Sequence, residues 1–215
     1  MVNVLLLDDH AVVRTGYRRL IDAEPDLCVV AEASTSDEAY TLLQQGGIDV
    51  AVVDMSLRGA SGIEAIRRFL ARDPQLRVMV LSMHDSPGFV TQAIRAGALG
   101  YLTKSSEPLD MLEGIRAVAR GRRVLAPEIA QSLAEASLDG NALLNRLTPR
   151  EFEVLRMAAT GEPTQEIASQ MHLSPKTVLN HLSMVRQKLN AESDFKLLRL
   201  AVRHGLVDLA GEVAC

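Results

Sequence analysis

The stretch VNVLLLDD, residues 2–9, sets the first element of the fold. A run of aliphatic residues from Val4 to Leu7 ends in two adjacent carboxylates, Asp8 and Asp9. A continuous aliphatic run predicts a strand that is covered on both faces. Two like charges side by side raise the electrostatic energy unless something positive offsets them. The pair therefore predicts a metal ion, a lysine or a helix start close by.

The same kind of apolar run recurs through the first 120 residues. The runs are VNVLLLD (2–8), LCVVAEA (27–33), DVAVVD (49–54), RVMVLS (77–82) and GYLT (100–103). Segments with helical spacing separate or follow them, at 10–23, 36–45, 61–72, 87–96 and 108–120. Strand and helix in alternation predict a doubly wound α/β domain over residues 1–120, with five parallel strands and helices on both faces.

After residue 120 the pattern becomes helical. Residues 121–145 are interpreted as a linker with one helix at 127–137, and residues 146–215 as a second, all-helical domain. In that domain Thr148, Pro149 and Glu151 form a capping box with proline at the first helical position. Further helices are expected at 164–171, 175–189 and 194–205.

Composition narrows the class of protein. The chain has 215 residues, 47% of them apolar and 23% charged, which is typical of a soluble globular protein. No apolar run approaches the roughly 20 residues that span a bilayer. No signal peptide is evident, and two cysteines make no disulfide framework, so a reducing cytoplasm is expected. The net charge is −4, yet residues 176–199 hold five basic and two acidic residues, a modest basic patch.

Polar side chains follow four of the predicted strands. In open parallel sheets functional groups gather at the carboxyl ends of the strands. Those ends carry Asp8 and Asp9, Asp54, Ser82 and Lys104. Three carboxylates favour a Mg²⁺ site, and Asp54, alone on its strand, is placed to attack a phosphoryl donor. Mg²⁺ and Lys104 would offset charge on the transferring group, and Ser82 would donate to a phosphoryl oxygen.

Any one acid after a strand can equally be a loop residue or a helix cap. What favours a catalytic role is that polar side chains of the right kinds stand at four strand ends together. A Mg²⁺-dependent phosphohydrolase with an aspartyl intermediate is one alternative. Such enzymes usually place nucleophile and acid two residues apart on one strand, whereas Asp8 and Asp9 are adjacent and Asp54 lies on another strand.

Residues 1–120 resemble a response-regulator receiver domain. The resemblance rests on the triplet DDH after the first strand and on the residues matching Asp54, Gly62, Ser82 and Lys104. It implies phosphorylation of Asp54 by a sensor histidine kinase or a small phosphodonor. It implies Mg²⁺ held by Asp9, Asp54 and the backbone carbonyl of Ser56, with Asp8 acting mostly through water. It also implies that Ser82 and Tyr101 change position when the phosphate arrives. Without the resemblance, Tyr101 would be interpreted only as a half-buried aromatic residue.

One departure from the family pattern lies after Asp54. The family usually carries Met-Pro where this chain has Leu57 and Arg58. The change removes no chemical group, but arginine for proline loosens the loop and adds a cation. A receiver that no longer switches by phosphate, attached to a transcription regulator, is therefore a further alternative.

The segment from Ser174 to Leu189 predicts a helix with two distinct faces. Val178, Leu182 and Val185 share one apolar face, with polar side chains opposite them. A short helix and a tight connection precede it, which is the arrangement of a helix-turn-helix that enters the DNA major groove. Asn and Gln can bond adenine edges, and Lys or Arg can reach phosphates. A plain solvated helix face remains the alternative.

The segment LTPREFEVLRMAATGEPTQEIASQMHLSPKTVLNHLSMVRQKLNA, residues 147–191, resembles the DNA-binding domain of the NarL/FixJ (LuxR-type) response regulators. The resemblance implies a four-helix domain that dimerises on promoter DNA, with the chain as a homodimer when phosphorylated and not an enzyme. Leu179 and Ser183 are uncharged where the family often has basic residues, and Leu179 can touch a thymine methyl instead. The expected DNA-binding residues are Thr164, Lys176, Thr177, Leu179, Asn180, Ser183, Arg186, Gln187 and Lys188.

Overall fold

The computed structural model describes residues 1–57, 61–138 and 142–207. The chain divides into two compact units. Residues 1–85 with 93–130 form the first unit, and residues 86–92 with 131–215 form the second.

One parallel sheet forms the core of the first unit. Its strands run in the order β2-β1-β3-β4-β5-β6. They are β1 (Val2–Leu7), β2 (Leu27–Ala33), β3 (Val50–Asp54), β4 (Arg77–Ser82), β5 (Gly100–Thr103) and β6 (Val124–Leu125). The five expected strands are confirmed. The sixth, two residues long, lies within the stretch 121–145 that the sequence predicts to be a linker. Its residues show no strand periodicity, because so short a run forms a strand only by pairing with β5.

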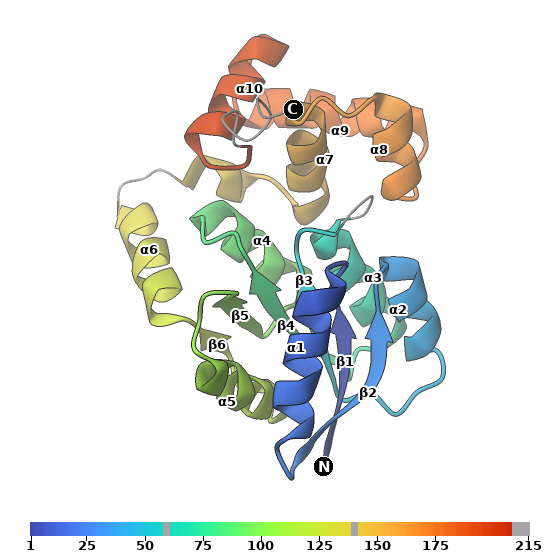
Figure 1. Cartoon of the computed structure of the whole chain (residues 1–215). Helices are drawn as coiled ribbons and strands as arrows, with labels where there is room; N and C mark the ends of the chain where they lie inside the picture. Colours follow the sequence, from blue (N-terminus) through green and yellow to red (C-terminus); the bar gives the residue numbers. More distant parts are fainter. Residues whose placement is uncertain (58–60, 139–141, 208–215) are drawn as a thin grey trace. The chain divides into compact units, whose positions relative to one another are not determined.

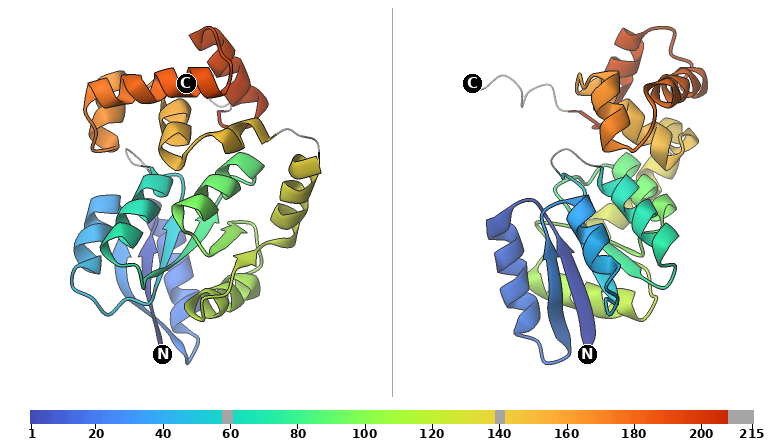
Figure 2. Two further views of the ribbon diagram at one scale, coloured as in Figure 1. Left: turned by 180° about the vertical axis from the view of Figure 1, so that it is seen from behind. Right: turned by 90° about the vertical axis from the view of Figure 1, so that its right-hand side faces the viewer.

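Helices connect successive strands and cover both faces of the sheet. They are α1 (Ala11–Asp22), α2 (Ser36–Leu43), α3 (Gly62–Arg72), α4 (Pro87–Ala96) and α5 (Pro108–Ala119). A further helix, α6 (Pro127–Leu138), follows β6. Figures 1 and 2 show α1 and α5 on one face and α2 and α3 on the other. The buried aliphatic residues of β1, β3 and β4 lie between these two layers, as the continuous apolar runs predicted.

The strand register brings the predicted side chains to one edge. Asp54 is level with Leu81 of β4, and Ser82 is level with Thr103 of β5. Lys104 follows Thr103 directly, and its backbone N–H donates to the carbonyl of Ser82. The carboxyl ends of these parallel strands therefore meet at a single edge of the sheet.

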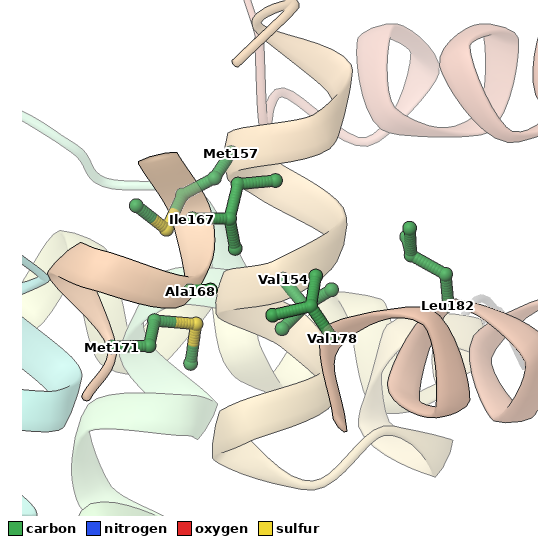
Figure 3. Packing of buried hydrophobic residues seen from close by; sticks show 7 residues of the cluster. All are labelled: Val154, Met157, Ile167, Ala168, Met171, Val178 and Leu182. Carbon is green, nitrogen blue, oxygen red and sulfur yellow. The ribbon is translucent and has the colours of Figure 1, made fainter. Parts of the chain in front are cut away.

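Among the described residues of the second unit, four helices follow a 3-10 turn at Ala142–Arg146. They are α7 (Pro149–Ala159), α8 (Thr164–Gln170), α9 (Pro175–Lys188) and α10 (Asp194–Arg203). Figure 3 shows the side chains through which α7, α8 and α9 pack together. That buried cluster is Val154, Met157, Ile167, Ala168, Met171, Val178 and Leu182. It fixes α9 against its two neighbours.

No helix in the described part of the chain is long and apolar enough to cross a membrane.

Candidate functional site

The acidic cluster is built around the side chain of Lys104. Its Nζ donates to Asp54 Oδ2 at 2.7 Å and to Asp8 Oδ2 at 2.8 Å. Both carboxylates are buried, with Asp54 only 2% exposed. Burial lowers the pKa of Lys104, but the hydrogen bonds and charges of Asp54 and Asp8 outweigh it and raise that pKa above its ordinary value. The lysine therefore stays charged and offsets the carboxylates that it bridges.

Further ligand atoms lie beside this ion pair. Single ligand atoms from Asp8, Asp9, His10 and Asp54 all lie within 4.8 Å of one another. The backbone N–H of Ser56 donates to Asp54 Oδ1 at 3.1 Å, so the chain turns back around the carboxylate immediately after β3. Three carboxylates in one group are a donor set that suits a hard divalent cation.

Arg14 of α1 holds the backbone beside the cluster. Its Nη1 donates to the carbonyl oxygen of Asp8 at 2.6 Å, and its Nε donates to Glu32 Oε2 at 3.3 Å. Arg18 also bonds Glu32. The network ties the end of β1 to α1 and β2, which fixes the chain where Asp8 and Asp9 leave the sheet.

Ser82 and Tyr101 are linked through the loop after β4. The backbone N–H of His84 donates to Ser82 Oγ at 3.0 Å, and Tyr101 Oη donates to the carbonyl of His84 at 2.6 Å. Tyr101 is fully buried, which corrects the expectation of a half-buried aromatic. Burial raises the pKa of its phenol, so it stays a neutral donor.

Sequence reasoning gave no role to two residues of this region, His10 and Arg14. His10 carries a visible signal, because it stands directly after the acid pair. Arg14 carries none, because its contacts with Asp8 and Glu32 form only when α1 packs beside β2.

Helix α9 presents the surface that its periodicity predicted. Val178, Leu182 and Val185 are buried. The exposed side chains are Lys176, Leu179, Asn180, Ser183 and Gln187, while Thr164, Thr177, Arg186 and Lys188 are half-buried. Leu179 is 56% exposed and stands among these polar side chains. Ser174 caps the helix by accepting from the backbone N–H of Thr177.

Two of the expected phosphate-binding cations already have acidic partners within the unit. Lys188 Nζ donates to Glu151 Oε2 at 2.6 Å, and Arg186 bonds Asp194. Glu151 is buried and also accepts from the backbone N–H of Thr148 at 2.8 Å. Burial raises the pKa of the Glu151 carboxyl, but the hydrogen bonds from Lys188 and Thr148 outweigh it and lower that pKa. The pair ties the start of α7 to the end of α9.

Comparison with known proteins finds a matching protein family for each of the two parts of the chain. Residues 4–116 match the response regulator receiver domain, and residues 145–201 match the bacterial regulatory proteins of the luxR family. The chain is 35% identical to the response regulator UvrY of Escherichia coli strain K12 over 209 residues, which is 96% of each chain. The chain belongs to the two-component response regulators.

This response regulator is also similar to solved structures over most of its length. One is RcsB from Salmonella enterica serovar Typhimurium, bound to the P1flhDC promoter in the presence of the phosphomimetic BeF3⁻, with a TM-score of 0.73 and 28% identity. It covers 93% of this chain and 97% of that one. Another, of two RcsB dimers bound to two parallel DNAs, has a TM-score of 0.61, 28% identity and the same coverage.

The response regulator thus has a receiver domain and a LuxR-type DNA-binding domain, as the two resemblances implied. The structure brings together Asp8, Asp9, Asp54 and Lys104. Arg58 of the atypical loop lies outside the described residues, and its effect stays a prediction.

Proposed function

We propose that this response regulator is a transcription regulator switched by phosphorylation of Asp54. The observation that carries the proposal is the contact of the Lys104 ammonium with both Asp54 and Asp8. A positively charged donor fixed against the acceptor carboxylate is placed to offset the charge of an incoming phosphoryl group.

The proposed chemistry is transfer of a phosphoryl group to the Asp54 carboxylate. An Asp54 oxygen attacks the phosphorus, an O–P bond forms, and the bond from phosphorus to the donor breaks. The donor is phosphohistidine of a sensor kinase or an acyl phosphate. Lys104 shares its hydrogen bonds between Asp54 and the new phosphate, and Ser82 Oγ donates to a phosphoryl oxygen.

The donor set of the cluster fits Mg²⁺. Asp8, Asp9, Asp54 and the backbone carbonyl of Ser56 would hold it, and the ion would neutralise charge on the transferring group. Three carboxylates with ligand atoms within 4.8 Å support this assignment, because Mg²⁺ takes a few carboxylates and keeps its remaining waters.

DNA is the proposed partner of the second unit. Helix α9 offers exposed Asn180 and Gln187 for base edges, Leu179 for a thymine methyl and Lys176 for phosphate. The structure of RcsB on promoter DNA and that of two RcsB dimers on two parallel DNAs support a homodimer on promoter sites. A regulator with this partner works in the cytoplasm. Nothing in the described residues favours a phosphohydrolase or a phosphate-independent regulator over this function.

The test is intact mass after incubation with Mg²⁺ and acetyl phosphate. The wild type is expected to gain one phosphoryl group, and Asp54→Asn none, because an amide oxygen is too weak a nucleophile. Asp110→Asn, an exposed acid on α5, is the matched control and should gain mass like the wild type. Equal labelling of wild type and Asp54→Asn would contradict the assignment of the acceptor.

A further inference from the structure

The two cations near the end of α9 are paired with acids of very different exposure. Lys188 bonds Glu151, whose side chain is only 7% exposed, whereas Arg186 bonds Asp194, whose side chain is 81% exposed. Glu151 is held by the backbone N–H of Thr148 as well. Of these two cations, Arg186 is therefore the one whose acidic partner lies at the surface, where the phosphate of DNA can compete for the guanidinium.

Arg186 lies on the side of α9 that carries exposed residues. It follows Leu179 by seven residues and Ser183 by three, and side chains with this spacing share one side of a helix. Its Nε donates to Asp194 Oδ1 at 3.2 Å, and its Nη2 donates to the same oxygen. Two guanidinium donors that could meet a phosphate therefore bond a carboxylate of the same unit.

The start of α10 fixes the position of Asp194. Asp194 is the first residue of that helix, and Ser193 caps the helix by accepting from the backbone N–H of Lys196. A negative charge in the first turn of a helix is favoured by the helix dipole. Arg186 and Asp194 also line an apolar cavity between α7, α9 and α10, so water screens their attraction from one side only. The carboxylate is therefore held where it neutralises Arg186.

A cation that is already neutralised by a carboxylate adds little to the attraction for DNA, and phosphate contacts supply affinity whatever the base sequence. We propose that Asp194 masks Arg186 from DNA phosphate and so keeps the sequence-independent affinity of the unphosphorylated protein low. The inference rests on the proposed function for DNA as the partner of α9. Because a single copy then binds weakly, occupancy of a promoter depends on two copies that are joined and bind together.

The test is fluorescence anisotropy of the full-length, unphosphorylated protein with labelled DNA duplexes of unrelated sequence, at several salt concentrations. Asp194→Asn is expected to tighten binding about fivefold at low salt, evenly across the duplexes, and to steepen the slope of log affinity against log salt by about one unit. Glu192→Gln, at an exposed acid two residues earlier, removes the same charge and is the matched control. It should tighten binding by less than about twofold.

A second background separates release of Arg186 from the charge of Asp194 itself. When Arg186→Met is present, Asp194→Asn should change binding no more than Glu192→Gln does, because no guanidinium is left to release. Asp194→Ser, which also starts a helix well, should behave as Asp194→Asn does in both backgrounds.

Three other outcomes decide against the proposal. An equal gain from Asp194→Asn with and without Arg186 would mean that the carboxylate repels DNA directly. A gain no larger than that of Glu192→Gln would mean an effect of net charge alone. Either result, with wild type binding DNA, would overturn this inference and leave the proposed function standing. Failure of the proposed function looks different, because neither wild type nor Asp194→Asn would bind any duplex, and that result would overturn both.

Discussion

Gly62, the first residue of α3, has no room for a side chain. A Cβ placed there would lie 2.8 Å from the carbonyl oxygen of Asp54 and 2.7 Å from the Cα of Met55. Both contacts are backbone atoms, so relief must come from moving the chain that carries Asp54. We expect Gly62→Ala to destabilise the protein by about 1–3 kcal/mol in chemical denaturation and to slow phosphorylation by acetyl phosphate.

Gly16, in the middle of α1, is the control for that prediction. A Cβ at Gly16 meets no atom within 4 Å. Alanine is the better helix former, so Gly16→Ala is expected to stabilise the protein by about 0.5–1 kcal/mol without changing phosphorylation. Gly62→Ala with wild-type stability and wild-type phosphorylation would show that the loop after Asp54 yields freely.

At the scale of the element, α9 combines a cation with an exposed aliphatic residue. Lys176 is exposed near its start, one turn from Leu179. A phosphate contact carries no sequence information, so Lys176→Ala should weaken binding evenly across DNA sequences and reduce the salt slope by about one unit. Leu179→Ala should instead reduce discrimination at one thymine by about 1–3 kcal/mol. Fluorescence anisotropy at several salt concentrations separates the two, and the same effect from both variants would contradict these roles.

The ion pair between Glu151 and Lys188 makes α7 and α9 depend on pH. Because folding lowers the pKa of Glu151, its stabilisation is complete above its ordinary pKa of 4.5 and is lost as pH falls through the lowered pKa. Lys188→Met leaves a buried carboxylate without its cation, and we expect a loss of about 2 kcal/mol at pH 7. That loss should shrink as pH falls through the lowered pKa of Glu151 in the wild type, because the carboxyl then becomes protonated in both proteins. Denaturation over a series of decreasing pH values measures this, and a loss that does not change with pH would assign the effect to packing alone.

The elements themselves were largely predictable, because each buried strand is a continuous aliphatic run and each helix carries its own period. The acidic cluster followed from one topological rule, since parallel strands deliver Asp8, Asp54 and Lys104 to the same edge. Local pattern could not predict β6, which exists by pairing with β5, nor the bond between Glu151 and Lys188, 37 residues apart. Both depend on tertiary packing, which leaves no periodic trace in a single sequence.

At the scale of the whole molecule, the proposed switch must obey thermodynamic reciprocity. If phosphate on Asp54 raises affinity for promoter DNA by some factor, then DNA raises affinity for the phosphate analogue by the same factor, typically about 5–150-fold. We expect beryllofluoride with Mg²⁺ to tighten DNA binding, and saturating DNA to tighten beryllofluoride binding equally. Asp54→Asn should bind DNA at the basal level whether or not beryllofluoride is present. Two titrations of the wild type, one for each ligand with the other at saturation, give the two factors. A rise in DNA affinity without the matching rise for beryllofluoride would mean that the analogue acts on DNA binding through another site.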